Sequence, residues 1–339
     1  MKLVSVPRAV GSRAARFLLL ASIALMPALS QGLAVALEGG ETVAVDPTNL
    51  PLGDGRTSRA PQLGALWTCQ TSFNGSGAFR NGPWIHTDGT YDSTRKAIVS
   101  GEVEWAPELS IEVQGSTRVI RGNGLPNHPT GIFPILAREE AYQYDRNPNQ
   151  ISPQNLRLQF PANPQVAAAP SCVGGTVGFL LSGGSLFDGF DAGGRDAVAY
   201  ESQDACGGHP EVTGAYHYHA VSPCIEDPGS GHSVLTGYAL DGFGIYGNRG
   251  ESGESLTNRD LDECHGHTHL IDWDGEQVEM FHYHATAEFP YSVGCYRGAH
   301  TESGPPQGGP PPGGSPQGPQ SQRPGGPPPF GGPPPPPRR

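Results

Sequence analysis

The stretch that organises this chain is Gly214-Ala215-Tyr216-His217-Tyr218-His219-Ala220 (GAYHYHA, 214–220). A near copy, FHYHA, occupies residues 281–285. Each copy is preceded by the pattern D-x-C-x-G-H, which reads DACGGH at 204–209 and DECHGH at 262–267, and each is followed by a further cysteine. Because the same signals recur in the same order, the sequence predicts an internal duplication of a histidine- and cysteine-containing unit.

The alternation of residue types within each copy predicts which side chains lie together. In an extended strand, successive side chains point to opposite faces, so His217 and His219 share one face and Tyr216 and Tyr218 the other. We expect the two copies to lie side by side, with their four imidazoles meeting at one common centre.

A single H-x-H pair is common by chance, but two such pairs, each preceded by another histidine three residues after a repeated cysteine, favour a metal site. An H-x-H pair on a strand separates two Cα atoms by roughly 6.6 Å on one face, so both imidazoles can reach one ion. The predicted ligands are His209, His217, His219, His267, His282 and His284, with His128, His265 and His269 as weaker candidates. Six imidazoles exceed one tetrahedral shell, so either two ions bind or some histidines only support the ligands. His86, His232 and His300 have no such context and are predicted to be surface residues.

The donor type restricts the metal. Imidazoles with carboxylates nearby suit zinc, copper, nickel or iron and argue against calcium and magnesium, which prefer oxygen ligands. We expect a transition-metal cofactor, copper or zinc, between which the sequence does not decide.

Several carboxylates and tyrosines near the histidines have two interpretations. Asp204 and Asp262 are expected to orient imidazoles together with Tyr218 and Tyr283, although both aspartates could equally cap a turn. Asp241 is the catalytic candidate, as a ligand or general base, and an ordinary Asp-Gly turn is its alternative. The histidines themselves could instead hydrogen-bond to loop backbone and stack on the tyrosines without any metal.

The six cysteines indicate three disulfides and an oxidising compartment. No C-x-x-C motif occurs, so a thiolate metal site is not expected. The repeat favours one bridge per unit, Cys206 with Cys224 and Cys264 with Cys295, which leaves Cys69 for Cys172.

Composition divides the 339 residues into four parts. Residues 1–36 have a basic start, an apolar run and a small-x-small site, as in a secretory signal that is either cleaved or retained as an anchor. Residues 37–66 are predicted to be an irregular entry segment, and 67–302 the folded domain. Residues 303–339, rich in Pro and Gly, are predicted to be a disordered tail, with cell-surface or matrix association as its expected use.

Charge and hydropathy limit the partners and the location. The formal net charge is −12, and loss of residues 1–36, with four basic and no acidic side chains, would make it −16. Such a chain attracts cations and repels nucleic acid. No later segment is apolar for long enough to cross a membrane. We therefore expect a secreted protein, periplasmic or extracellular.

The fold is predicted to be mainly β, a single disulfide-stapled domain with long Gly- and Pro-rich loops. β-Branched and aromatic residues favour strands at 97–105, 109–120, 173–182 and 238–246, whereas only 137–144 suggests a helical turn. The chain contains 49 Gly and 35 Pro, which interrupt every longer periodic pattern.

Motifs along residues 123–298 resemble those of the YHYH domain family. They are GLPNHPTG (124–131), DACGGHP (204–210), GYALDGFGIYG (237–247), LDECHGH (261–267) and FHYHAT followed by EFPYSVGCYRG (281–298). The resemblance implies little chemistry, because the family is known by its motif rather than by an activity. Phe281, where the first copy has Tyr216, predicts that this aromatic position packs rather than donates a hydrogen bond.

Three functions remain open at this point. The first is a metal-dependent enzyme, hydrolytic with zinc or oxidative with copper, and the second is a protein that sequesters or carries metal. The third is an extracellular structural or adhesive module with buried, metal-free histidines. No serine-hydrolase elbow, P-loop, dinucleotide fingerprint or H-E-x-x-H helix occurs, so those classes lack support.

Overall fold

The computed structural model describes residues 45–299. The predicted signal (1–36), the start of the entry segment and the predicted tail (303–339) lie outside the described residues, as does His300. The described part is mainly β, as expected. None of its helices has the length and hydropathy needed to cross a membrane.

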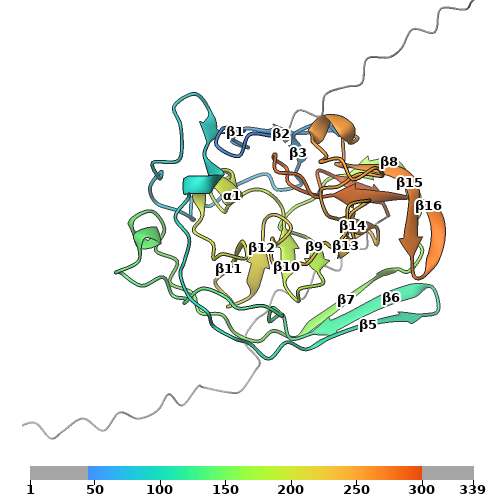
Figure 1. Cartoon of the computed structure of the whole chain (residues 1–339), viewed down its shortest axis with the longest axis horizontal. Helices are drawn as coiled ribbons and strands as arrows, with labels where there is room; N and C mark the ends of the chain where they lie inside the picture. Colours follow the sequence, from blue (N-terminus) through green and yellow to red (C-terminus); the bar gives the residue numbers. More distant parts are fainter. Residues whose placement is uncertain (1–44, 300–339) are drawn as a thin grey trace, which may run out of the picture. The chain divides into compact units, whose positions relative to one another are not determined.

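An eight-stranded sheet forms the centre of the described fold, with the order β11-β12-β10-β9-β13-β14-β16-β15. Figure 1 shows β9 to β14 in the middle of the view, β15 and β16 at the right, and β5, β6 and β7 below. The strands are β9 (Thr176–Leu180), β10 (Ser185–Phe187), β11 (Gly208–Pro210), β12 (Tyr216–Tyr218), β13 (Leu235–Ala239), β14 (Gly244–Tyr246), β15 (Gly266–Trp273) and β16 (Glu276–His284).

The sheet has two halves with the same topology, so the duplication extends beyond the histidine motifs. In the first half β9 and β10 are antiparallel, β10 runs parallel to β12, and β12 pairs antiparallel with β11. In the second half β13, β14, β16 and β15 repeat these relations in the same order. The halves join through the antiparallel pair β9–β13, centred on Phe179 opposite Tyr238. This register gives the sheet an approximate two-fold axis.

The core lies largely against this central junction. The three-stranded sheet of β5 (Leu109–Gln114), β6 (Thr117–Gly122) and β7 (Leu156–Pro161) contributes Phe160, whose ring centroid lies 5.6 Å from that of Tyr238. A second apolar cluster contains Trp84, Tyr91 and residues of α1 (Ala197–Tyr200). The remaining elements are short: β1 (Leu50–Pro51), β2 (Thr57–Ser58), β3 (Leu66–Trp67), β4 (Thr90–Tyr91), β8 (Val166–Ser171), β17 (Tyr296–Gly298) and the 3₁₀ turns η1 (Ser93–Arg95), η2 (Glu140–Gln143) and η3 (Asn258–Asp260).

The predicted strands differ from the observed ones where glycine or turn residues intervene. The apolar run 109–120 is a hairpin, β5 and β6, because Gly115 adopts a positive φ of 65° that reverses the chain. The run 238–246 is likewise divided between β13 and β14 by a turn containing Gly242, φ 95°. Residues 97–105 form only isolated bridges, at Val99 and Val103.

The three disulfides are the predicted ones: the repeat paired Cys206 with Cys224 and Cys264 with Cys295, and Cys69 is joined to the remaining Cys172. No cysteine of the described chain is free. Three disulfides fit an extracellular protein.

Candidate metal centres

One half of the sheet gathers three imidazoles, which we call the first centre: His209, His217 and His219. His209 on β11 lies opposite His217 on β12, and His219 follows β12 directly. Each of the three residues is 3% exposed, and their candidate ligand atoms lie within 4.8 Å of one another. The strand alternation predicted from the sequence therefore brings these histidines together.

Backbone carbonyls fix the tautomers of two of these rings. His217 Nδ1 lies 3.3 Å from the Ala215 carbonyl and His219 Nδ1 lies 2.5 Å from the Asp188 carbonyl. A carbonyl only accepts, so each Nδ1 carries the proton and each neutral ring has a bare lone pair on Nε2. The two Nε2 atoms face each other at 3.2 Å. Two lone pairs at this distance repel unless a proton or a metal ion lies between them.

Burial and charge act in opposite directions on this centre. Burial lowers the pKa of His209 and of His217 well below the usual range, with neighbouring imidazoles adding to the effect. Burial also lowers the pKa of His219, but hydrogen bonding and charge from Glu201 and the Asp188 carbonyl outweigh it, so that pKa is raised overall. The corner of the centre beside Glu201 therefore favours a positive charge.

The first centre opens onto a cleft of about 940 Å³. His209, His217 and His219 all line this cleft, together with Glu201 and Phe187. A volume near the upper end of the usual range for ligand sites, roughly 300–1,000 Å³, admits a small organic molecule.

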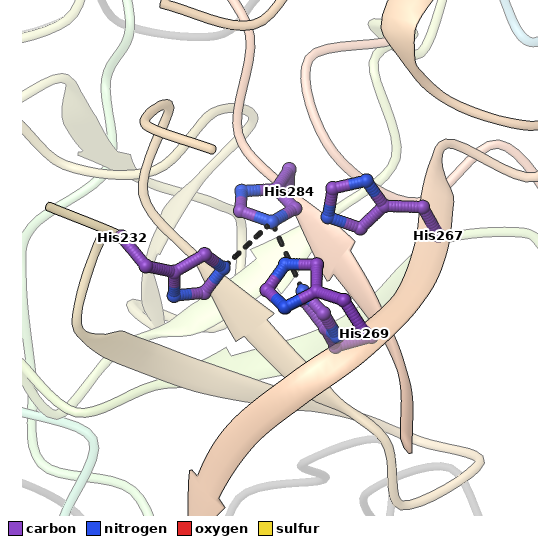
Figure 2. A group of neighbouring side chains, drawn as sticks. His232, His267, His269 and His284 are labelled. Carbon is purple, nitrogen blue, oxygen red and sulfur yellow. Dashed lines mark hydrogen bonds between the residues drawn. The ribbon is translucent and has the colours of Figure 1, made fainter. Parts of the chain in front are cut away.

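The other half of the sheet gathers five imidazoles, which we call the second centre: His232, His267, His269, His282 and His284. His267 and His269 come from β15, and His282 lies opposite His267 on β16. Figure 2 shows the labelled rings of His232, His267, His269 and His284 pointing toward a common space. Their candidate ligand atoms also lie within 4.8 Å of one another.

The second centre repeats the tautomers of the first. His282 Nδ1 donates to the Met280 carbonyl at 3.0 Å and His284 Nδ1 to the Gly247 carbonyl at 2.6 Å. Their Nε2 atoms are 3.1 Å apart, and His232 Nε2 lies 3.2 Å from His284 Nε2. Burial lowers the pKa of His282 to about 3 and that of His267 to about 4. Both rings are therefore neutral near neutral pH, the state in which imidazole binds a metal ion.

In each centre, one imidazole packs against an aromatic ring, and the two aromatic residues come from equivalent strands of the two halves. The Phe187 ring on β10 stacks on His217 at 4.1 Å between centroids, and the Tyr246 ring on β14 lies 5.0 Å from that of His282. Such packing restricts the imidazole orientations and excludes water from one side.

The centres are separate, so the prediction of one common centre is wrong. β12 and β16 have four strands between them in the sheet. With neighbouring strands about 4.8 Å apart, they are separated by about 24 Å along the sheet. The two-fold relation places the equivalent units on opposite sides of the β9–β13 junction, whereas the sequence repeat alone contains no information on this order.

Two weaker candidates lie outside both clusters. His128 donates through Nδ1 to the Pro129 carbonyl and accepts at Nε2 from the Tyr218 hydroxyl, 2.7 Å away. The nearest sulfurs belong to the Cys206–Cys224 disulfide and offer no thiolate. His265 has a positive φ of 76°, which removes it from the strand alternation, and its Nε2 bonds to Thr286 Oγ1 at 3.0 Å.

The aspartates of the repeats organise turns rather than imidazoles. Asp204 Oδ1 accepts from the N–H groups of Cys206 and Gly208, and Asp262 Oδ1 accepts from those of Cys264 and Gly266. Both aspartates thus follow the turn-capping alternative. Of the tyrosines predicted to orient imidazoles, Tyr218 bonds to His128, whereas Tyr283 bonds to Asp241.

The Tyr216 and Phe281 positions differ as expected. The Tyr216 hydroxyl donates to Asp204 at 2.8 Å, whereas the Phe281 ring packs on Phe243 and Tyr283. In the second half, Arg297 Nε lies 3.4 Å from Asp262 and replaces the missing hydroxyl as a partner of the carboxylate.

Asp241 is fully buried and lies in the turn between β13 and β14. Its Oδ2 accepts from the Tyr283 hydroxyl at 2.6 Å and from the N–H groups of Arg297 and Gly298 at 3.1 and 2.8 Å. Burial raises the pKa of the carboxyl, while these hydrogen bonds oppose the shift. Its partners lie away from both sets of imidazoles, so these contacts favour a structural role.

Sequence reasoning missed two residues of the centres. His232 was predicted to be a surface residue, but its Nε2 faces His284 within the second centre. Glu201, at the end of α1, contacts two imidazoles of the first centre. Both lie outside the repeated motifs, so the repeat gave no signal for them.

Comparison with known proteins agrees with the motif resemblance. Residues 157–257 match the family model described as YHYH protein. The matched segment covers the β9–β10 hairpin, the first centre and the β13–β14 hairpin, and it ends before the second histidine pair. No curated protein and no solved structure gives a significant match. The family match is thus narrower than the resemblance over 123–298, and it assigns no activity.

Proposed function

We propose that this chain is a secreted, histidine-rich protein that binds two transition-metal ions, copper or zinc, one at each centre. The observation that carries the proposal is the pair of facing Nε2 atoms, 3.2 Å apart in one centre and 3.1 Å in the other. Ligands about 2.05 Å from a tetrahedral ion are separated by roughly 3.3 Å, so the rings stand close to the edge length of such a shell.

Buried ring nitrogens without a hydrogen-bond partner support the same proposal. His209 Nδ1 and Nε2, His267 Nε2 and His269 Nε2 are buried without a hydrogen-bond partner. A buried polar atom without a partner costs roughly 1–3 kcal/mol, and a bound cation would remove that cost at any bare ring nitrogen facing it. The metal-free structural module is therefore the weaker alternative, because it leaves these atoms unsatisfied and opposes the lone pairs of His282 and His284, whose pKa values are lowered by burial.

The metal content of the purified full chain tests this function. We expect two equivalents of Cu²⁺ or Zn²⁺ per chain after equilibrium dialysis, measured by elemental analysis. His217→Gln and His282→Gln should each lose about one equivalent, because each removes one of the facing nitrogens from a different centre.

His86→Gln is the matched control, because His86 bonds to Thr90 away from both centres and should leave two equivalents. Stoichiometric metal that is unchanged in both centre variants would contradict the proposed ligands. Wild-type protein that binds no metal would support the metal-free module instead.

The cleft makes catalysis a second candidate function for the first centre. Three imidazoles leave room for a water or substrate on a zinc or copper ion, and the cleft gives that position access. We expect azide to shift the visible spectrum of the Cu²⁺-loaded protein, and the shift should persist in His282→Gln and vanish in His217→Gln. A carrier with a closed shell would show no azide-dependent change.

A further inference from the structure

Resting on the proposed function, we propose that Glu201 is an anionic ligand of the first centre, so that the two centres of one chain select different cations. The first centre would hold its ion with three imidazoles and one carboxylate, and a fifth position of the ion would remain open toward the cleft. The second would use imidazoles alone. Carboxylate oxygen suits harder ions such as Mn²⁺ as well as Zn²⁺, whereas an all-imidazole shell suits copper, nickel or zinc.

The position of Glu201 supports this role. Its Oε2 lies 3.4 Å from His219 Nε2 and 3.5 Å from His209 Nε2, and its side chain is 12% exposed. These distances exceed the usual N–H···O range of about 2.7–3.2 Å, so neither contact is a strong hydrogen bond. They are close to the separation of two ligands around one ion, roughly 3.3 Å.

The backbone before Glu201 is held firmly. α1 ends at Tyr200, and the Glu201 N–H donates to the Ala197 carbonyl at 3.0 Å. Within α1, Trp84 Nε1 donates to the Ala199 carbonyl at 2.9 Å and Lys96 Nζ to the Val198 carbonyl at 2.5 Å. A ligand on a rigid element keeps its position without the metal, which lowers the entropic cost of binding.

His209 provides an independent sign that a ligand belongs here. It is 3% exposed, and neither of its ring nitrogens has a hydrogen-bond partner. A buried imidazole normally uses at least one nitrogen. Since Nε2 of His209 lies toward the same carboxylate oxygen as Nε2 of His219, a cation at this place would satisfy His209, His219 and Glu201 together.

The second centre has a further imidazole where the first repeat has a carboxylate of a turn. The residue two positions after the first histidine of the repeat is Glu211 in one half and His269 in the other. Glu211 accepts from the N–H groups of Thr213 and Ala215, so it belongs to a turn, whereas His269 joins the imidazole cluster. The carboxylate near His269, Glu251, contacts only Nδ1 at 3.5 Å and is 64% exposed.

A Mn²⁺ titration of the full chain, followed by electron paramagnetic resonance of the free ion, tests the proposal. We expect wild-type protein to bind one Mn²⁺ and two Zn²⁺. Glu201→Gln, which keeps the shape but removes the charge, should weaken Mn²⁺ binding at least about tenfold and leave Zn²⁺ at the second centre unchanged. Glu211→Gln, which neutralises another carboxylate of the same cleft, should change Mn²⁺ affinity less than about twofold.

The outcomes separate this inference from the proposed function. Zn²⁺ retained at the second centre, with an unchanged circular dichroism spectrum, shows that Glu201→Gln is folded. If wild-type protein binds two Zn²⁺ but Glu201→Gln binds Mn²⁺ as tightly as wild type, the role of Glu201 is overturned and the metal centres stand. The same follows if Glu211→Gln loses as much Mn²⁺ affinity as Glu201→Gln. No Zn²⁺ bound by wild type would instead refute the metal centres themselves.

Discussion

Asp241→Ala is expected to lower the free energy of unfolding by about 3–5 kcal/mol, because it removes a buried carboxylate that organises the second half of the sheet. Four donors would lose their acceptor: the Tyr283 hydroxyl and the N–H groups of Phe243, Arg297 and Gly298. Leaving several buried donors unsatisfied costs more than the modest net gain from one hydrogen bond. Urea unfolding of the metal-free protein measures the loss.

The two-fold relation supplies a matched control for Asp241. The equivalent turn between β9 and β10 carries Ser182, whose Oγ donates to the Tyr218 hydroxyl at 2.9 Å. Ser182→Ala removes one neutral hydrogen bond and should cost only about 1 kcal/mol. If Asp241→Ala kept wild-type stability but abolished a metal-dependent activity, the catalytic interpretation of Asp241 would replace the structural one.

Local sequence patterns predicted those parts of the site that depend on neighbouring residues. Strand alternation put His217 and His219 on one face, and their Nε2 atoms meet as that periodicity requires. The repeated position of cysteine after each histidine pair predicted the bridges Cys206–Cys224 and Cys264–Cys295, which the structure contains. In both cases the determining contacts lie within one repeated unit.

The predictions that were wrong concern contacts that depend on the order of strands in the sheet. Which strands become neighbours is decided by the hairpins β9–β10 and β13–β14, which lie outside the histidine motifs and separate the two units. His232 reaches the second centre from the segment before β13, and Glu201 reaches the first from the end of α1. Periodicity within a strand carries no information on such contacts.

The turn before β15 shows that strand periodicity also fails at short range, within a single repeat. His265 stands in an alternating C-H-G-H-T-H run, and an extended chain would put it on the face of His267 and His269. Its φ of 76° reverses the chain just before β15, so its ring turns to Thr286 instead. The first repeat has Gly207 at this position, with a nearly equal φ of 77°, and this glycine is the signal that the position is a turn.

Removing one disulfide is expected to damage one centre and leave the other intact. The bridge Cys206–Cys224 spans 18 residues that include every imidazole of the first centre, and Cys264–Cys295 spans 31 residues that include four of the five in the second. Opening loops of this size should lower the free energy of unfolding by about 3–4 kcal/mol each, within a usual range of about 2–5 kcal/mol. The Cys206→Ser/Cys224→Ser protein should therefore keep the metal ion of the second centre and lose affinity at the first, and Cys264→Ser/Cys295→Ser should show the reverse.

The third disulfide, Cys69–Cys172, is a control that distinguishes a loss of stability from a loss of metal binding. Cys69–Cys172 spans 103 residues and encloses no ligand of either centre, so its removal should lower stability by about 4–5 kcal/mol at unchanged metal stoichiometry, provided that the variant is folded at the temperature used. Elemental analysis and urea unfolding of the three double variants measure both quantities. Simultaneous loss of both ions in either repeat variant would mean that the two halves act as one cooperative unit. Loss confined to one centre is expected because each loop closes on its own pair of strands, and the strand pairing between the two halves of the described sheet passes through β9 and β13 alone.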